Sequence, residues 1–334
     1  MQLGLEADAQ NADVHVQAGR IAMRKGDLPK ALEEANKALA KDAKDVGALY
    51  LLLRAQAQQG TVSQSLTRLQ QLANTYRDDL GVQLAYGEAQ LLLGQYTQAR
   101  AAVTRVLTLA ETSVPAMKLL ARVYMGLKRP ITAEYVLQRA IEIERDPEAL
   151  TLLAGIRMGE GKLVQARVLL EEAIQTEPGY LEALNSLGVV YAQVRNFEAS
   201  QEVLMRAVAA APSFAQAWLD LGSAQRGLGQ FEAAEKSWQK TLSLDAKLAE
   251  AWFNLGVLYL ENPLPGKDRL RQLTDAINAF QGYKRGRAGA EQDPNAEKYI
   301  GEAQLLYKQE EEKRKQDLKT PPPAGDETTE PDAG

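Results

Sequence analysis

Residues 217–246 read AWLDLGSAQRGLGQFEAAEKSWQKTLSLDA, and the spacing within this stretch decides the fold. Its apolar residues recur at intervals of three and four in two runs, which predicts helices at about 214–227 and 231–245. Gly229 lies in the turn between them, where glycine tolerates the positive φ that a tight turn requires. The stretch shows no acid–base pair, nucleophile or phosphate-binding loop, so its regularity indicates a role in shape.

The same spacing recurs along most of the chain, in steps of 33 or 34 residues. The clearest column is made of alanine and serine: Ala31, Ser65, Ala99, Ala133, Ala166, Ser200 and Ala234. A second column follows seven residues later, with Ala38, Leu72, Val106, Ala140, Ala173, Ala207 and Thr241. A third lies twelve residues before the first, with Gly19, Leu53, Gly87, Ala121, Ala154, Gly188, Gly222 and, in an eighth repeat, Gly256. Three aligned columns identify an internal repeat array.

The residues at the repeating positions resemble the signature of the tetratricopeptide repeat (TPR) family over about 12–260. One repeat matches it with Trp218, Leu221, Gly222, Phe231, Ala234, Trp238 and Thr241. The preceding repeat matches it with Leu184, Leu187, Gly188, Tyr191, Phe197, Ser200, Leu204, Ala207 and Pro212. The first two repeats depart from it, since His15 and Leu49 replace the early aromatic residue, and Ala43 and Arg77 the closing proline. The resemblance implies an all-α fold: a right-handed α-solenoid of about eight TPR helix pairs with a C-terminal capping helix.

The predicted domain organisation follows from these repeats. Residues 1–11 form an N-terminal lead, and residues 12–262 form the TPR array, with repeats starting near residues 12, 46, 80, 114, 147, 181, 215 and 249. Residues 263–319 hold an irregular last repeat and a capping helix, whose start is signalled by Asp293 followed by Pro294. Residues 320–334 lack large apolar side chains and are expected to be a disordered acidic tail. Because stacking supplies the core, Ala234→Trp should overpack the contact between helices and lower the free energy of unfolding by about 1–3 kcal/mol.

Composition excludes several classes of function. The net charge of −5 argues against a nucleic-acid binder, and the absence of cysteine excludes thiolate chemistry. His15 is the only histidine, so a zinc site built from several histidines cannot form. The glycines of GIRMGEGKL at 155–163 do not have the spacing of a phosphate loop, and no apolar run approaches the roughly 18 residues of a membrane span. The sequence therefore predicts a protein that is not an enzyme and has no cofactor, metal site or transmembrane segment.

The family resemblance implies a concave face lined mainly by the first helix of each repeat. The expected partner-binding residues are Arg20, Tyr50, Arg54, Leu84, Lys118, Arg122, Asn185, Leu219, Phe253 and Val257. Arginine and lysine place positive charge in the first half of this face, and apolar residues dominate the second half. We therefore expect the groove to take a peptide with acidic groups and apolar anchors. Reversing the charge of the three arginines together should abolish capture of the partner.

The leading hypothesis is a non-enzymatic scaffold that binds partner proteins along the groove. The chain also looks like bacterial TPR proteins of envelope assemblies, including outer-membrane lipoproteins of pilus and gliding-motility machines, which implies a periplasmic or outer-membrane location. Its polar start would fit a mature form that lacks a lipid-anchored cysteine. The alternative is a cytoplasmic regulatory or targeting adaptor of an enzyme complex. A third hypothesis is docking to anionic surfaces through a basic segment with Arg269, Arg271, Lys284, Arg285 and Arg287.

Overall fold

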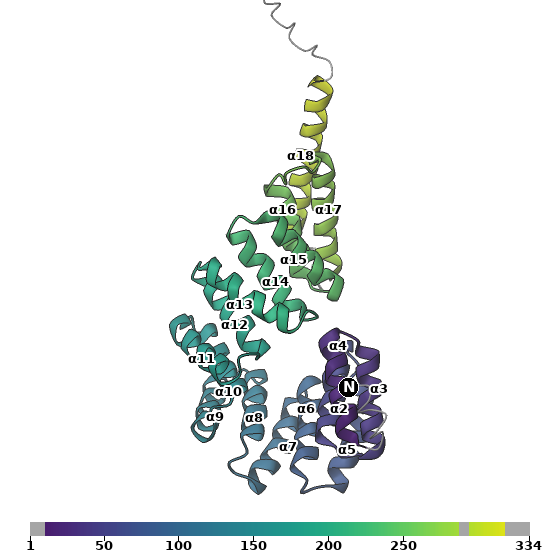
Figure 1. Cartoon of the computed structure of the whole chain (residues 1–334), viewed down its shortest axis with the longest axis vertical. Coiled ribbons are helices and arrows are strands. Elements are labelled where there is room, and N and C mark those ends of the chain that lie inside the picture. Colours follow the sequence, from purple (N-terminus) through teal and green to yellow (C-terminus); the bar gives the residue numbers. More distant parts are fainter. Residues whose placement is uncertain (1–10, 287–293, 318–334) are drawn as a thin grey trace, which may run out of the picture. The chain divides into compact units, whose positions relative to one another are not determined.

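The computed structural model describes residues 11–286 and 294–317, and the described part is all-α. It contains 17 helices and no strand within these ranges, which confirms the predicted α-solenoid class (Figure 1). The chain divides into two compact units, Met1–Leu228 and Gly229–Gly334, so the boundary falls between the two helices of the seventh repeat. The predicted lead up to residue 10 and the predicted tail lie outside the described residues.

The N-terminal unit contains six helix pairs and the first helix of a seventh. The bounds are α2 (Ala12–Lys25), α3 (Leu28–Lys41), α4 (Val46–Gln59), α5 (Ser63–Thr75), α6 (Leu80–Leu92), α7 (Tyr96–Leu109), α8 (Val114–Gly126), α9 (Pro130–Ile143), α10 (Pro147–Gly159), α11 (Leu163–Thr176), α12 (Leu181–Gln193), α13 (Phe197–Ala210) and α14 (Ala215–Gly227). The even-numbered helices are the first helices of the repeats, and each packs against the next even-numbered helix along the unit. The odd-numbered helices pack against both neighbouring first helices in most repeats.

The C-terminal unit contains α15 (Phe231–Leu244), α16 (Ala249–Glu261), α17 (Arg269–Gly286) and α18 (Pro294–Asp317). The last repeat is irregular because a longer connection joins α16 to α17, in which Gly266 adopts a positive φ of 72°. Helix α18 packs along α17, and its Tyr299 ring stacks on Phe280 with centroids 5.2 Å apart. This aromatic contact places α18 over the last helix pair, as expected of a capping helix.

Four of the first helices begin with an acidic or hydroxyl cap at the same position of the repeat. The side chains of Asp45, Asp79, Ser113 and Asp146 each accept a hydrogen bond from the backbone N–H three residues later. Such caps satisfy one of the donors that a helix start leaves free, and each contributes about 1 kcal/mol. The caps stabilise these helix starts, while α12, α14 and α16 begin at the same point of the repeat without a side-chain cap.

The turns within the repeats carry the predicted positive φ angles. Gly26, Gly60, Gly94, Gly161 and Gly229 have φ values of 78°, 72°, 71°, 73° and 72°. In the fourth and sixth repeats the same column holds Lys128 and Arg195, with φ of 59° and 61°. The turn geometry is therefore kept even where glycine is absent, which means that the packing of the flanking helices imposes it.

The three repeat columns form the contact between paired helices. Ala31, Ala99, Ala133, Ala166, Ser200 and Ala234 are all fully buried. A Cβ atom added to Gly188 would lie 2.4 Å from Leu204 Cγ, so only glycine permits this approach of α12 to α13. Ser200 donates its hydroxyl to the Gly188 carbonyl at 2.8 Å. The predicted register of small residues is confirmed by this burial.

The histidine and tryptophans have structural surroundings. His15 is buried, and its Nδ1 lies 2.7 Å from Glu34 Oε2 on the paired helix. Trp238 is fully buried, while Trp218 and Trp252 each donate the indole N–H to a backbone carbonyl six residues earlier, at 3.0 Å. Within the two described ranges, no helix combines the length and apolarity that crossing a membrane requires.

Candidate partner-binding groove

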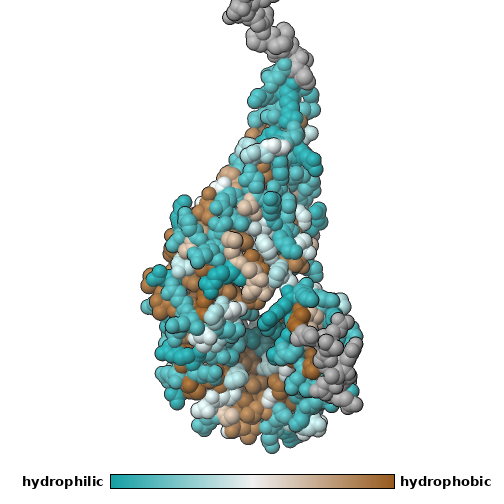
Figure 2. Space-filling view, in the orientation of Figure 1, coloured by the Kyte–Doolittle hydropathy of each residue, from teal (hydrophilic) through white to brown (hydrophobic). Residues whose placement is uncertain are grey.

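The concave side of the N-terminal unit is lined by the first helices of the repeats. Figure 1 shows α6, α8, α10 and α12 on the inner side of the curved unit, with α7, α9 and α11 outside them. Figure 2 shows a hollow in this unit between α4 and α6 on one side and α10 and α12 on the other. We call this hollow with its lining helices the groove.

The unit curls until distant repeats meet. Arg54 on α4 lies 3.7 Å from Glu182 at the start of α12, and Ser213 donates its hydroxyl to the Arg24 carbonyl at 2.6 Å. The partners in these two contacts are separated by 128 and 189 residues, so both join opposite ends of the array. The groove is therefore narrow, and an inserted segment would meet side chains from two walls.

Two of the predicted cationic residues are already neutralised within the array. The Arg122 guanidinium forms two hydrogen bonds to the carboxylate of Glu88, at 2.7 and 2.8 Å. Lys118 Nζ lies 2.8 Å from Asp146 and 2.9 Å from Glu148. Burial works against both positive charges, but the neighbouring carboxylates outweigh burial and raise the pKa of Arg122 and Lys118 above their usual values.

Of the four predicted cations, only the two in the first two repeats therefore remain available to a partner. Arg20 is exposed and forms no ion pair with any described residue. The Arg54 side chain is 74% exposed and holds Glu182 only at 3.7 Å. Both arginines can turn toward an acidic group of a partner without breaking a strong internal contact, because exposed pairs of this kind contribute little to stability.

The predicted tyrosine, leucines and asparagine of this unit lie on first helices and are partly or fully buried. Tyr50 is partly buried, and burial followed by the nearby Glu88 carboxylate raises its pKa above the usual value. Leu84 and Leu219 are only 7% and 6% exposed, so they pack against neighbouring helices more than they face solvent. Asn185 is buried as well and forms a polar contact described below.

The two remaining predicted residues lie in the C-terminal unit and have different surroundings. Phe253 packs against the rings of Phe280, Tyr283 and Tyr299, with centroids 5.8, 5.3 and 5.7 Å away. Val257 is 5% exposed. Both side chains serve the packing of α16 with its neighbours, so they offer a partner little apolar surface.

A carboxylate that the sequence analysis passed over lies at the end of the N-terminal unit. Asp220 Oδ2 on α14 accepts hydrogen bonds from Asn185 Nδ2 on α12, at 2.9 Å, and from Gln216 Nε2, at 3.2 Å. Burial raises the pKa of Asp220 above its usual value, although both amides stabilise the charged form. The sequence signal was available, because Asp220 is the only charged residue in a column that otherwise holds Gln17, Leu51, Ala85, Leu119, Leu152, Ser186 and Asn254.

A second surface missed by the sequence analysis lies on the outer helices of two adjacent repeats. Ile131 and Tyr135 on α9 are 81% and 72% exposed, and Val164 and Val168 on α11 are 70% and 54% exposed. We call these four residues the outer patch. The same two columns hold polar, small or proline residues in the other repeats: Pro29 and Glu33, Ser63 and Thr67, Thr97 and Ala101, Glu198 and Glu202, and Glu232 and Lys236. A cavity of about 270 Å³ with largely apolar walls lies beside Tyr135 and reaches Leu107, Met117 and Leu120.

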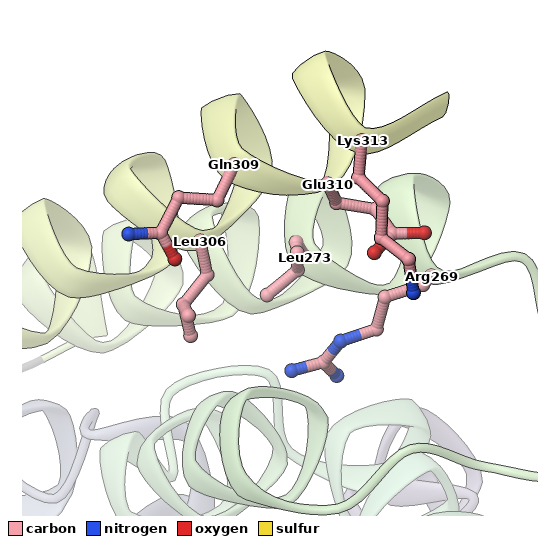
Figure 3. A pocket seen from close by; sticks show the side chains of 6 residues that line it. All are labelled: Arg269, Leu273, Leu306, Gln309, Glu310 and Lys313. Carbon is pink, nitrogen blue, oxygen red and sulfur yellow. The ribbon is translucent and has the colours of Figure 1, made fainter. Parts of the chain in front are cut away.

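The basic segment of the C-terminal unit is partly used for internal contacts. A cavity of about 250 Å³ lies between α17 and α18 (Figure 3), and it is lined by Arg269, Leu273, Leu306, Gln309, Glu310 and Lys313. The Arg269 guanidinium donates to the carbonyls of Tyr259 and Leu260, at 2.8 and 2.7 Å, and so caps the end of α16. Lys284 pairs with Glu297. Arg271 and Arg285 are exposed, and Arg287 lies outside the described residues.

Comparison of the sequence with protein families identifies the class of this protein. One tetratricopeptide repeat model matches residues 90–156 and 157–222, and a second matches residues 16–79 and 219–294. Together these matches span most of the chain, so the protein belongs to the tetratricopeptide repeat family. Repeats of this family are generally non-enzymatic modules of protein–protein interaction, and this chain has the architecture of an interaction scaffold.

Solved structures share this fold at low sequence identity. The APC/C hetero-tetramer Cut9–Hcn1 superimposes with a TM-score of 0.67 at 18% identity, covering 90% of this chain and 56% of that one. This chain thus spans little more than half of that relative. Pseudomonas aeruginosa pilF gives a TM-score of 0.55 at 17% identity, and the match covers 65% of this chain and 97% of the pilF chain. These likenesses show the fold alone, and the expected link to pilus or motility lipoproteins is not confirmed. No curated protein matches the sequence.

Proposed function

We propose that the chain is a scaffold that holds a segment of a partner protein in the groove of its N-terminal unit. The observation that carries this proposal is the approach of Arg54 to Glu182 across the groove, at 3.7 Å with both side chains substantially exposed. A segment inserted there would exchange this weak pair for its own contacts with two walls. Extended and helical peptides both fit such a mode of recognition, in which shape and a few polar groups select the partner.

The test uses the full chain as bait and compares two charge-reversal variants. Arg20→Glu with Arg54→Glu should lose the proteins that the wild type captures from lysate, as identified by mass spectrometry. Arg100→Glu with Arg105→Glu is the matched control, since both arginines are exposed on the outer helix α7 and the charge change is the same. We leave Arg122 unchanged, because its reversal would set two carboxylates against each other at Glu88. Equal capture by both variants would place binding outside the groove.

The outer patch is a second candidate surface for a partner. Exposed apolar residues that recur at the same outward positions of two adjacent repeats are candidates for an interaction site. Only the fourth and fifth repeats carry apolar residues in both of these columns, which favours local selection of this surface. Ile131→Gln with Val164→Gln should leave the melting temperature unchanged and reduce partner capture. Unchanged capture would exclude the patch.

The proposal also concerns the assembly in which the scaffold works. The sequence resemblance offers two settings: a multiprotein assembly of the bacterial cell envelope, for pilus or motility functions, or a cytoplasmic adaptor of an enzyme complex. Fractionation of cells that express the complete natural gene distinguishes them. Recovery with outer membranes supports the envelope setting, and recovery in the cytosol supports the adaptor.

A further inference from the structure

Asp220 is the only charged residue in its repeat column, where four of the other repeats hold an apolar side chain and three hold a neutral polar one, Gln17, Ser186 and Asn254. The same column holds Leu51, Ala85 and Leu119, which are 4%, 0% and 3% exposed. Asp220 itself is partly buried. A carboxylate costs free energy in such surroundings unless an opposite charge or several hydrogen bonds compensate it. A charged residue that a repeat array places in such a column without a compensating cation is a candidate for function.

The array supplies no cation to Asp220. Among the described residues its only side-chain partners are the amides of Asn185 and Gln216, and both donate to the same oxygen, Oδ2. The other oxygen, Oδ1, accepts no hydrogen bond and is not among the fully enclosed unpaired atoms. This contrasts with Glu88 and Asp146 on the first helices of earlier repeats, which the array itself pairs with Arg122 and Lys118.

Asn185 adds a second unsatisfied acceptor. The residue is 9% exposed, and its Oδ1 is enclosed without any hydrogen-bond partner. A carboxylate only accepts hydrogen bonds, so the NH₂ group of Asn185 must face Asp220, and this fixes Oδ1 as the unpaired atom. The donors of the pair are thus directed at Asp220, and unpaired acceptors are left over. Asn185 Oδ1 is enclosed, so the unpaired acceptor that a ligand can reach at this point is Asp220 Oδ1, and such a ligand must bring a donor.

We propose that Asp220, with Asn185 beside it, forms a subsite that binds a cationic side chain, arginine or lysine, of the partner segment held in the groove. This proposal rests on the groove being the binding face. A guanidinium or ammonium group supplies both the positive charge and several N–H donors, and charge-assisted hydrogen bonds of this kind are about twice as strong as neutral ones. The partial burial of Asp220 reduces screening by water and strengthens the attraction.

The subsite changes the expected character of the partner. Of the four predicted cations, only Arg20 and Arg54 in the first two repeats lack a strong internal pair, whereas Asp220 on α14 is a carboxylate without a cation. A uniformly acidic peptide would be repelled at Asp220. The partner segment therefore carries a basic residue where it passes α12 and α14, and the acidic groups expected from the sequence are confined to the part that faces α2 and α4.

Defined peptide libraries test the subsite without knowledge of the partner. The probes are four mixtures of nine-residue peptides, randomised except at the central position, which is fixed as Arg, Lys, Glu or Leu. Binding to the full chain is measured by fluorescence anisotropy. The wild type should bind the Arg and Lys mixtures at least tenfold more tightly than the Glu mixture, and Asp220→Asn should abolish this preference. Asn185 can still donate to the new amide oxygen, so this variant keeps the local hydrogen bond.

The control variant is Glu198→Gln, which removes one negative charge from an exposed position of the neighbouring helix α13. It should keep the preference of the wild type. If the wild type binds the mixtures without preferring cations, or if Asp220→Asn keeps the preference, the subsite is refuted while the groove survives. If no mixture binds, the groove proposal fails, and the subsite fails with it. Loss of preference in Glu198→Gln as well would show a general charge effect and would also refute the subsite.

Discussion

Arg122 and Glu88 hold the same position in successive repeats, 34 residues apart, and their side chains form a bidentate ion pair across α8 and α6. Glu88 is 8% exposed, and the side chain of Arg122 is 31% exposed. The pair is thus largely shielded from solvent and links two successive repeats. Arg20 and Arg54 occupy the same column but form no bidentate ion pair. Arg122 therefore has a structural role, whereas Arg20 and Arg54 are available to a partner.

Removing the Arg122 side chain should destabilise the N-terminal unit. Arg122→Ala leaves Glu88 buried without its cation, and breaking a buried pair costs more than the pair contributes. We expect the free energy of unfolding to fall by about 2 kcal/mol. This loss is smaller than for a fully buried ion pair, because Arg122 is partly exposed. Urea unfolding followed by circular dichroism measures this change. Arg100→Ala on α7 is the control and should stay within about 0.5 kcal/mol. A loss that small for Arg122→Ala would contradict a structural role.

The same glycine-to-alanine change should have opposite effects in two adjacent repeats. At Gly188 the new Cβ would lie 2.4 Å from Leu204 Cγ, in a core without space, so we expect a loss of about 1–3 kcal/mol. At Gly155 on α10 nothing lies within 4 Å of the new atom. Gly155→Ala should therefore raise stability by about 0.5–1 kcal/mol through helix propensity. Thermal unfolding of both variants checks the signs, and equal signs would mean that the packing register is wrong.

The two non-glycine turns should gain stability from glycine. Lys128 and Arg195 have φ of 59° and 61°, a conformation that disfavours residues with a Cβ atom. Lys128→Gly and Arg195→Gly should each stabilise the fold by about 0.5–1 kcal/mol, because relief of strain exceeds the added entropy of the unfolded chain. Gly161→Ala in the same column is the reciprocal control and should destabilise. Calorimetric melting temperatures that fall in the glycine variants would refute this explanation of the turns.

The repeat explains why so much of the fold could be predicted. Columns of small residues such as Ala133 and Gly188 recur at fixed spacing, and close helix packing imposes the same requirement in every repeat. The turn position of Gly161 follows from the same register. Local spacing and tertiary contact agree in such an array, since each repeat touches mainly its neighbours.

The site was harder to predict because it depends on departures from the repeat. Arg122 and Arg20 look equivalent in the sequence, yet only Arg122 has a glutamate one repeat earlier, and only the structure shows that the two side chains meet. The burial of Phe253 depends on the packing of α18, which lies outside the repeat pattern. Asp220 was visible as the only charged residue of its column and Ile131 as an apolar residue in a mostly polar column, so comparison of the columns would have found both.

The last prediction concerns the pH dependence of stability at Asp220. Its pKa is raised above the ordinary value of 3.8, chiefly by burial, so the folded chain holds this proton more tightly than the unfolded chain does. The stability that the protonated carboxyl contributes is complete below pH 3.8 and is lost as the pH rises through the folded-state value. At neutral pH the charged Asp220 therefore opposes folding.

Asp220→Asn removes this penalty, since the amide stays neutral and can still accept the hydrogen bond from Asn185. We expect the variant to melt at a higher temperature than the wild type at pH 7 and at nearly the same temperature at pH 3. Glu198→Gln should show no such pH-dependent difference. If replacing Asp220 stabilises the fold at neutral pH, its contact between α12 and α14 does not contribute to stability. If Asp220→Asn is more stable at pH 7 and also loses the preference for cationic peptides, Asp220 serves binding and not folding. If Asp220→Asn melts at a lower temperature than the wild type at pH 7, then Asp220 stabilises the fold and its role is structural.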